Sequence, residues 1–98
     1  MSDLVQLNSI ISIAPGQVAA DLAHEVVILD SKSGRYFSLS AVGARIWQLI
    51  QTPCTVAQIL DTLLAEYEVE AERCETDLLA LLGKMQERGL IEVAADTE

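Results

Sequence analysis

The sequence predicts one α+β domain in which strands come first and three helices follow. Up to about residue 40 apolar residues alternate with the period of two that is typical of strands, and afterwards they recur with a helical period near 3.6. The length of 98 residues, 51% of them hydrophobic, suffices for one core but not for two. We expect a single domain over residues 1–98, with frayed ends at 1–3 and 94–98.

The best-defined stretch is residues 26–47, where an apolar strand, a turn, an aromatic strand and a helix start follow one another directly. The turn runs from Asp30 to Gly34, and Gly34 can take the positive φ that a bulged hairpin loop requires. The second strand is expected over Arg35–Leu39, and Ser40 is expected to end it and to cap the next helix. This unit predicts a β-hairpin that leads straight into a helix.

Two segments before the hairpin are expected to be extended. Residues 4–13 alternate loosely and are ended by Pro15 and Gly16. Residues 17–23 fit a short strand, with a helical turn as the alternative. The register of the first of these strands is not fixed by the pattern.

The first two helices are separated by Pro53, because the residue before a proline avoids the helical region. Thr55 and Gln58 form a capping box at the start of the second helix. The core stripe of the first helix is expected to comprise Val42, Ile46, Leu49 and Ile50, with Trp47 beside it. That of the second is expected to comprise Val56, Ile59, Leu60, Leu63, Leu64 and Tyr67.

The third helix follows a break at residues 68–70 and is expected to end at Gly89, which occupies the C′ position. Leu90 can fold back onto Met85, and residues 91–93 are expected to be extended. The core stripe of this helix is expected to comprise Cys74, Leu78, Leu81, Leu82 and Met85. Strands followed by three helices, with a tight turn between the first two, predict a winged helix-turn-helix-like arrangement.

The net charge of −9 disfavours binding to nucleic acid, because it repels a phosphate backbone. No stretch is apolar enough for a membrane span, and no basic residue precedes Lys32 as a signal peptide would require. We expect a cytoplasmic protein. Cys54 and Cys74 form no paired motif and are expected to be reduced packing residues.

The residues that catalysis requires do not form a recognisable set. His24 is the only histidine, so no second imidazole is present for a metal site. The carboxylates of residues 66–77 cluster around a helix start, where solvation and the helix dipole explain them. The glycines match no phosphate-binding motif. We expect a non-catalytic protein without a cofactor or metal.

Two features favour the binding of a peptide. A three-stranded sheet leaves strand edges with unpaired N–H and C=O groups, to which an extended peptide can add. Tyr36 and Ser38, on the strand face opposite Phe37 and Leu39, can then help to line a groove. Leu79 widens the apolar face of the third helix and either forms the other wall or simply enlarges the core.

The chain resembles the PqqD-like family, the RiPP recognition elements of pathways that modify ribosomally made peptides. The resemblance covers about residues 24–93 and is carried by short motifs that occur in the family's order. These are Leu29-Asp30, Gly34 to Tyr36, Leu39-Ser40, Gly43 to Trp47, Thr55 to Ile59 and Gly89 to Ile91.

The resemblance implies a winged-helix fold with three N-terminal strands and three helices. It also implies that the protein binds the leader segment of a precursor peptide as an added strand and delivers it to a separate leader protease, cyclase or radical enzyme. A lasso-type pathway is favoured over a PQQ-like one. The implied peptide-binding residues are Arg35, Tyr36, Phe37, Ser38 and Leu39 on the strand, and Cys74, Glu75, Leu78, Leu79 and Leu82 on the third helix.

Two other classes of function remain. A winged-helix DNA-binding regulator fits the predicted fold, but the third helix carries more acidic than basic residues. A purely structural subunit, such as a domain-swapped dimer, would show no affinity for peptides. The sequence leaves the oligomeric state open, including a homodimer.

Overall fold

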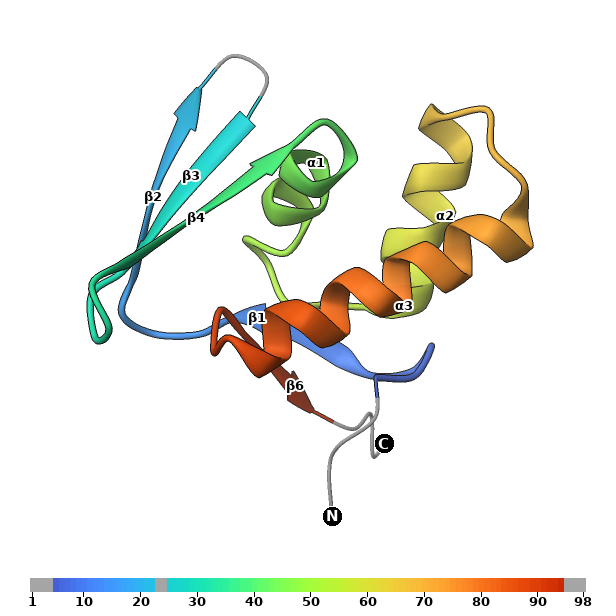
Figure 1. Cartoon of the computed structure of the whole chain (residues 1–98). Coiled ribbons are helices and arrows are strands. Elements are labelled where there is room, and N and C mark those ends of the chain that lie inside the picture. The colour runs from blue at the N-terminus through green and yellow to red at the C-terminus, as the bar shows by residue number, and fades with distance from the viewer. Residues whose placement is uncertain (1–4, 23–24, 95–98) are drawn as a thin grey trace.

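The computed structural model describes residues 5–22 and 25–94, without the side chain of Ser40. His24 and the ends expected to fray, apart from Ala94, lie outside these residues. Figure 1 shows the elements, which in chain order are β1 (Ile10–Ile13), β2 (Gln17–Leu22), β3 (Glu25–Asp30), β4 (Arg35–Ser40), α1 (Val42–Leu49), β5 (Cys54–Thr55), α2 (Val56–Glu66), α3 (Ala71–Glu87) and β6 (Ile91–Ala94).

The predicted α+β class is confirmed, but the expected number of strands is not. Four strands rather than three precede α1, and β5 and β6 come later in the chain. They form two separate sheets, ordered β2-β3-β4 and β5-β1-β6. The first strand was expected to extend one N-terminal sheet, whereas it pairs with segments from the second half of the chain. The winged-helix comparison stays a prediction.

The sheet β2-β3-β4 is a local antiparallel meander. Ile28 lies opposite Ala19 on one side and Phe37 on the other, which fixes the register of all three strands. The predicted hairpin turn between β3 and β4 is confirmed: Gly34 has φ of 73°, and its N–H donates to the carbonyl oxygen of Asp30 at 2.8 Å. The strand expected over 17–23 is likewise present as β2.

The sheet β5-β1-β6 joins distant parts of the chain. Only Ile10–Ile13 of the expected segment 4–13 is a strand, and it pairs antiparallel with both β5 and β6. Ala94 was expected to fray, but it lies opposite Ile10 in this ladder. The extended residues expected after α3 therefore close the second sheet.

The start of α1 differs from the prediction. The N-cap is Ala41 rather than Ser40, and no side chain caps the helix. Ala41 has φ of 51° and ψ of −118°, angles of the first central residue of a type II′ turn, where glycine is usual. Val42 was expected in the core but is 39% exposed, because this tight turn brings it to the surface.

The predicted start of α2 and the predicted C-terminal end of α3 are confirmed. The Thr55 hydroxyl accepts from the N–H of Gln58 at 3.1 Å, and the Gln58 side chain accepts from the N–H of Thr55 at 2.8 Å. Gly89 has φ of 74°, and the N–H of Leu90 donates to the carbonyl of Met85 at 3.0 Å. This second bond is the signature of a Schellman ending.

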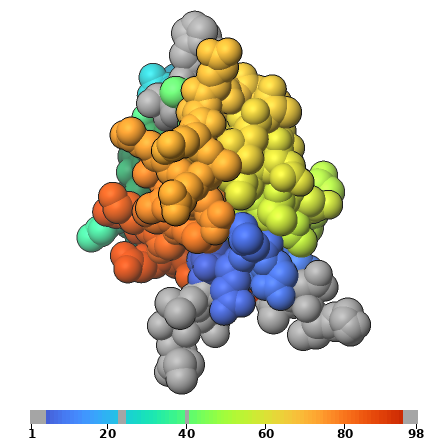
Figure 2. All heavy atoms as spheres, turned by 90° about the vertical axis from the view of Figure 1, so that its right-hand side faces the viewer, coloured from blue at the N-terminus to red at the C-terminus, as the bar shows by residue number. Residues whose placement is uncertain are grey.

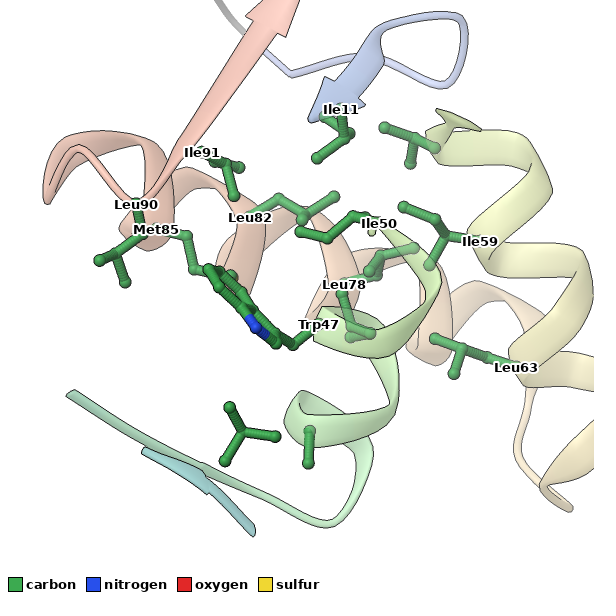
Figure 3. Packing of buried hydrophobic residues seen from close by; sticks show 14 of the residues in the cluster. Ile11, Trp47, Ile50, Ile59, Leu63, Leu78, Leu82, Met85, Leu90 and Ile91 are labelled. Atoms are coloured by element: carbon green, nitrogen blue, oxygen red, sulfur yellow. The ribbon is translucent and has the colours of Figure 1, made fainter. Parts of the chain in front are cut away.

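The core lies where the three helices meet both sheets. Trp47 of α1 is only 3% exposed and lies beside Met85 of α3 in Figure 3. The stripe predicted for α3 is buried at Leu78, Leu82 and Met85, whereas Cys74 and Leu81 are half-buried. The other buried aliphatic residues include Ile11, Val26, Ile28, Ile46, Ile50, Val56, Ile59, Leu60, Leu63, Leu90 and Ile91.

Candidate functional site

β4 is an edge strand with one side open. It pairs with β3, and no strand of the described residues pairs with its other side. In an antiparallel pair alternate residues turn their N–H and C=O groups toward the neighbour, so every second residue of β4 turns these groups to the open side. β2 is the other edge of the sheet, but α1 and α3 lie on the β4 side (Figure 1). An added strand on β4 would therefore meet helices as well as the sheet.

The side chains of β4 divide as predicted. Phe37 and Leu39 lie opposite the buried residues of β3 and are half-buried. Tyr36 on the other face is 70% exposed, and the Ser38 hydroxyl donates to Glu25 Oε2 at 2.7 Å. The strand thus shows an apolar side to the helices and a polar side to solvent.

Gly43 allows α1 to approach β4 closely. A Cβ atom at this position would lie 3.4 Å from side-chain atoms of Leu39, which is the short end of ordinary packing distances. Gly43 is buried and follows the strand end by only three residues. Its small size therefore helps to hold the start of α1 against the end of the edge strand.

A contact between Arg88 and Phe37 shows where the end of α3 lies relative to β4. The Arg88 guanidinium carbon lies 5.5 Å from the centroid of the Phe37 ring. This is within the range of a cation–π interaction. The C-terminal end of α3 therefore lies beside the first half of β4.

A cavity of about 270 Å³ lies where α1, α2 and α3 meet, near the end of β4. At roughly 30 Å³ per water molecule, this volume admits one large apolar side chain. The lining is mainly apolar and comprises Val42, Gly43, Ile46, Leu63, Val69, Arg73, Cys74, Asp77, Leu78 and Leu81.

The structure separates the residues predicted on α3. Cys74 and Leu78 line the cavity, whereas Leu82 is completely buried in the core. Glu75 and Leu79 are half-buried but do not line it. At about 100° per residue, both lie at least about 120° around the helix from Leu81. Leu79 packs against the core, in agreement with the interpretation that it enlarges the core rather than forming a groove wall.

Sequence reasoning missed the face of α3 that lines the cavity and reaches Phe37 of the edge strand. Arg73, Asp77 and Leu81 line the cavity, and Arg88 reaches Phe37. The spacing of 74, 77, 81 and 88 places these positions along one side of a helix. That pattern was available in the sequence, but the stronger leucine repeat at 78, 79 and 82 obscured it.

The electrostatics of the cavity do not favour covalent chemistry. Burial, and secondly the charge of Asp77, raise the pKa of the Cys74 thiol, so it stays protonated at neutral pH. Arg73 and Asp77 form an exposed pair at 3.9 Å, which contributes little to stability. Residues 5–22 and 25–94 contain no cluster of three His, Cys, Asp or Glu side chains that could hold a metal ion.

The helices in the described part of the chain are too short or too polar for any of them to span a bilayer.

Two solved structures are similar to this chain over most of its length. One is titled "TbiB1 in Complex with the TbiA(beta) Leader Peptide", with 38% identity, a TM-score of 0.81, and coverage of 87% of this chain and 99% of the other. The second is "Lasso peptide synthetase B1 complexed with the leader peptide", with 30% identity, a TM-score of 0.75, and coverage of 84% and 96%.

A family profile also matches most of the chain. Residues 25–91 match PqqD, described as coenzyme PQQ synthesis protein D. No curated protein matches significantly. Neither the family nor the two structures support the DNA-binding alternative. The chain belongs to the PqqD family.

Proposed function

We propose that this protein is a non-catalytic binder of the leader segment of a ribosomally made precursor peptide, which it delivers to a separate enzyme of a lasso-type RiPP pathway. The observation that carries this proposal is the open edge of β4, with an apolar cavity beyond its end. The titles of both structural neighbours name a leader peptide, and one names lasso peptide synthetase.

The leader would add to β4 as a fourth strand of the sheet β2-β3-β4. Main-chain hydrogen bonds would supply affinity that depends little on sequence, and side-chain pockets would supply the choice of sequence. Half-buried Phe37 and Leu39 form the apolar floor beside the edge. The cavity lined by Leu81 and Cys74 would accept one apolar leader side chain.

On α3, the residues that we propose to contact the leader differ from those predicted from the sequence. We keep Arg35–Leu39, Cys74 and Leu78, and we add Leu81 and Arg88. A completely buried side chain cannot contact a guest without rearrangement of the core, so Leu82 would act by supporting the helix.

Delivery would require no chemistry from this chain. Holding the leader on a protein that also contacts the processing enzyme raises the effective concentration of the substrate at that enzyme. A leader protease, a cyclase or a radical enzyme would then act on the bound precursor. The precursor is made on ribosomes, so we place this binding step in the cytoplasm.

The test is a titration of the purified chain with fluorescently labelled leader peptides. The probes are the leader encoded by the precursor gene beside this gene and the TbiA(beta) leader. We expect the adjacent leader to bind with a Kd below about 100 µM, a free energy of about −5.4 kcal/mol or better. Weaker binding by both leaders would sink the proposal. A scrambled leader of the same composition is the control for charge alone.

A further inference from the structure

The basic residues of this acidic chain gather at one end of the edge strand. The chain has six Lys and Arg residues against fifteen Asp and Glu residues. Four of the six are Lys32, Arg35, Lys84 and Arg88. Lys32 and Arg35 belong to the turn and start of β4, and Lys84 and Arg88 to the end of α3. The turn between β3 and β4 and the end of α3 lie on the same side of the molecule in Figure 1.

The contact between Arg88 and Phe37 brings these two groups together. Arg35 precedes Phe37 by two residues and therefore projects from the same face of β4. Lys84 lies one helical turn before Arg88, on the same side of α3. Packing on the Phe37 ring, at 5.5 Å, restricts where the Arg88 guanidinium can go. The start of the proposed peptide path along β4 and α3 is thus bordered by cations from both elements.

These four cations form no close ion pair among residues 5–22 and 25–94, where Arg45 and Arg73 are the basic residues that do, and the charge of Lys32 has only a minor effect on Asp30. The nearest strand carboxylate, Asp30, is opposite Arg35 but is nine-tenths buried. It accepts hydrogen bonds from the Ser33 hydroxyl, the Lys32 N–H and the Gln17 amide. Four exposed cations therefore lie at one end without a close ion pair in the described fold, and they can bind a negative group of a partner.

The other end of α3 has the opposite charge. Its first turns carry Glu70, Glu72, Glu75 and Asp77, and Arg73 there is already paired with Asp77. Figure 2 shows this end of α3 beside α2. The proposed peptide path therefore has a basic entrance at the β3–β4 turn and an acidic, apolar end at the cavity.

We propose that the basic entrance binds an acidic side chain of the guest peptide, held between Arg35 and Arg88, and that this contact sets the direction and register of the bound strand. The proposal rests on the proposed leader-binding function. A guanidinium presents a planar fork of donors that fits a carboxylate, and such charge-assisted bonds are about twice as strong as neutral ones. A leader lying in the reverse direction would bring its carboxylate to the acidic end, where like charges repel.

The experiment measures the affinity of the leader that binds the wild-type chain, using single substitutions that each remove one positive charge. We expect Arg35→Gln and Arg88→Gln to weaken binding at least about fivefold each. The matched control is Arg45→Gln, which removes the same charge from α1, where the side chain pairs with Glu66 and does not line the cavity, and it should change the Kd less than about twofold. The cation–π contact with the Phe37 ring comes from Arg88, so Arg35→Gln removes a charge and leaves that contact in place.

The second arm changes the peptide. Each Asp and Glu of the leader is replaced in turn by its amide, and one replacement should cost at least about fivefold in wild type but less than about twofold in Arg35→Gln. If Arg35→Gln and Arg88→Gln bind like Arg45→Gln, or no amide replacement couples to Arg35, the carboxylate site is wrong while leader binding stands. Failure of the wild-type chain to bind any leader would refute the proposed function, and the carboxylate site with it.

Discussion

The two sheets of this protein have the same number of strands but are built in different ways. In β5-β1-β6 the central strand comes from the N-terminal part and its neighbours from the middle and the end of the chain. In β2-β3-β4 consecutive strands pair, and the last strand keeps a free side. The first sheet ties distant segments around the core, whereas the second presents an edge. Stability and binding are therefore expected to respond to different substitutions.

The largest effect is expected in the sheet that joins the two halves of the chain. Ile11 of β1 is completely buried in the core cluster, so Ile11→Ala should lower the free energy of unfolding by about 2–5 kcal/mol. Urea unfolding checks this. Ile10→Ala, at a half-buried neighbour on the opposite face, should cost clearly less. Equal losses in both variants would contradict the assignment of β1 as the strand that closes the core.

The next effect is expected on binding, at the open edge. Ser38→Pro removes one N–H from β4, and proline is tolerated on edge strands. We expect the Kd for the leader to rise at least about tenfold, which corresponds to about 1.4 kcal/mol. Circular dichroism and urea unfolding would verify that the variant is folded.

The control for this substitution is Ser38→Ala, which keeps the N–H and removes only the hydrogen bond to Glu25. Its Kd should stay within about twofold of wild type, because that bond is exposed. A folded Ser38→Pro variant that binds the leader as well as Ser38→Ala would place the guest strand elsewhere.

A smaller effect is expected where β4 turns into α1. Ala41 has a positive φ, which costs about 1–3 kcal/mol for a residue with a Cβ. Glycine relieves this strain but gains entropy in the unfolded chain, so Ala41→Gly should stabilise the fold by about 1 kcal/mol. Thermal unfolding measures it. Ala80→Gly, at an exposed site within α3, should instead destabilise by about 1 kcal/mol. Destabilisation in both variants would contradict the claim that the backbone is strained at Ala41.

The smallest effect is a pH dependence in the turn of the open sheet. The Ser33 hydroxyl, followed by the Lys32 N–H and the Gln17 amide, lowers the pKa of Asp30 despite opposing desolvation. A lowered pKa means that the carboxylate stabilises the fold above its unfolded pKa of about 3.9, and that this contribution disappears as the pH falls through the folded pKa.

Asp30→Asn should therefore be less stable than wild type at pH 7, and the difference should shrink as the pH falls below about 4. Unfolding at a series of pH values measures it. A difference that is independent of pH would mean that the carboxylate charge contributes nothing to the turn.

The local parts of the fold were predictable because their signals lie within a few residues. The capping box of Thr55, the turn at Gly34 and the ending at Gly89 are each determined by nearby backbone hydrogen bonds. The N-cap was misplaced because Ser40 is the better capping residue by type, whereas the turn geometry puts Ala41 there.

The long-range parts were not predictable in the same way. Nothing local indicates that β1 pairs with β5 and β6 rather than with the hairpin. The rotation of α3 was also ambiguous, because its leucines at 78, 79, 81 and 82 cover more than one side of the helix. The resemblance to the PqqD family therefore suggested which elements to consider for the site, while contacts such as that of Arg88 needed the folded chain.

The most direct test of strand addition to β4 leaves the protein unchanged. A series of leader peptides, each N-methylated at one backbone nitrogen, is titrated against the wild-type chain. In an added strand alternate residues turn their N–H toward the neighbouring strand. We therefore expect the Kd to rise at every second position by about tenfold, with little change at the positions between. Equal sensitivity at consecutive positions, or none, would contradict binding of the leader as a fourth strand on β4.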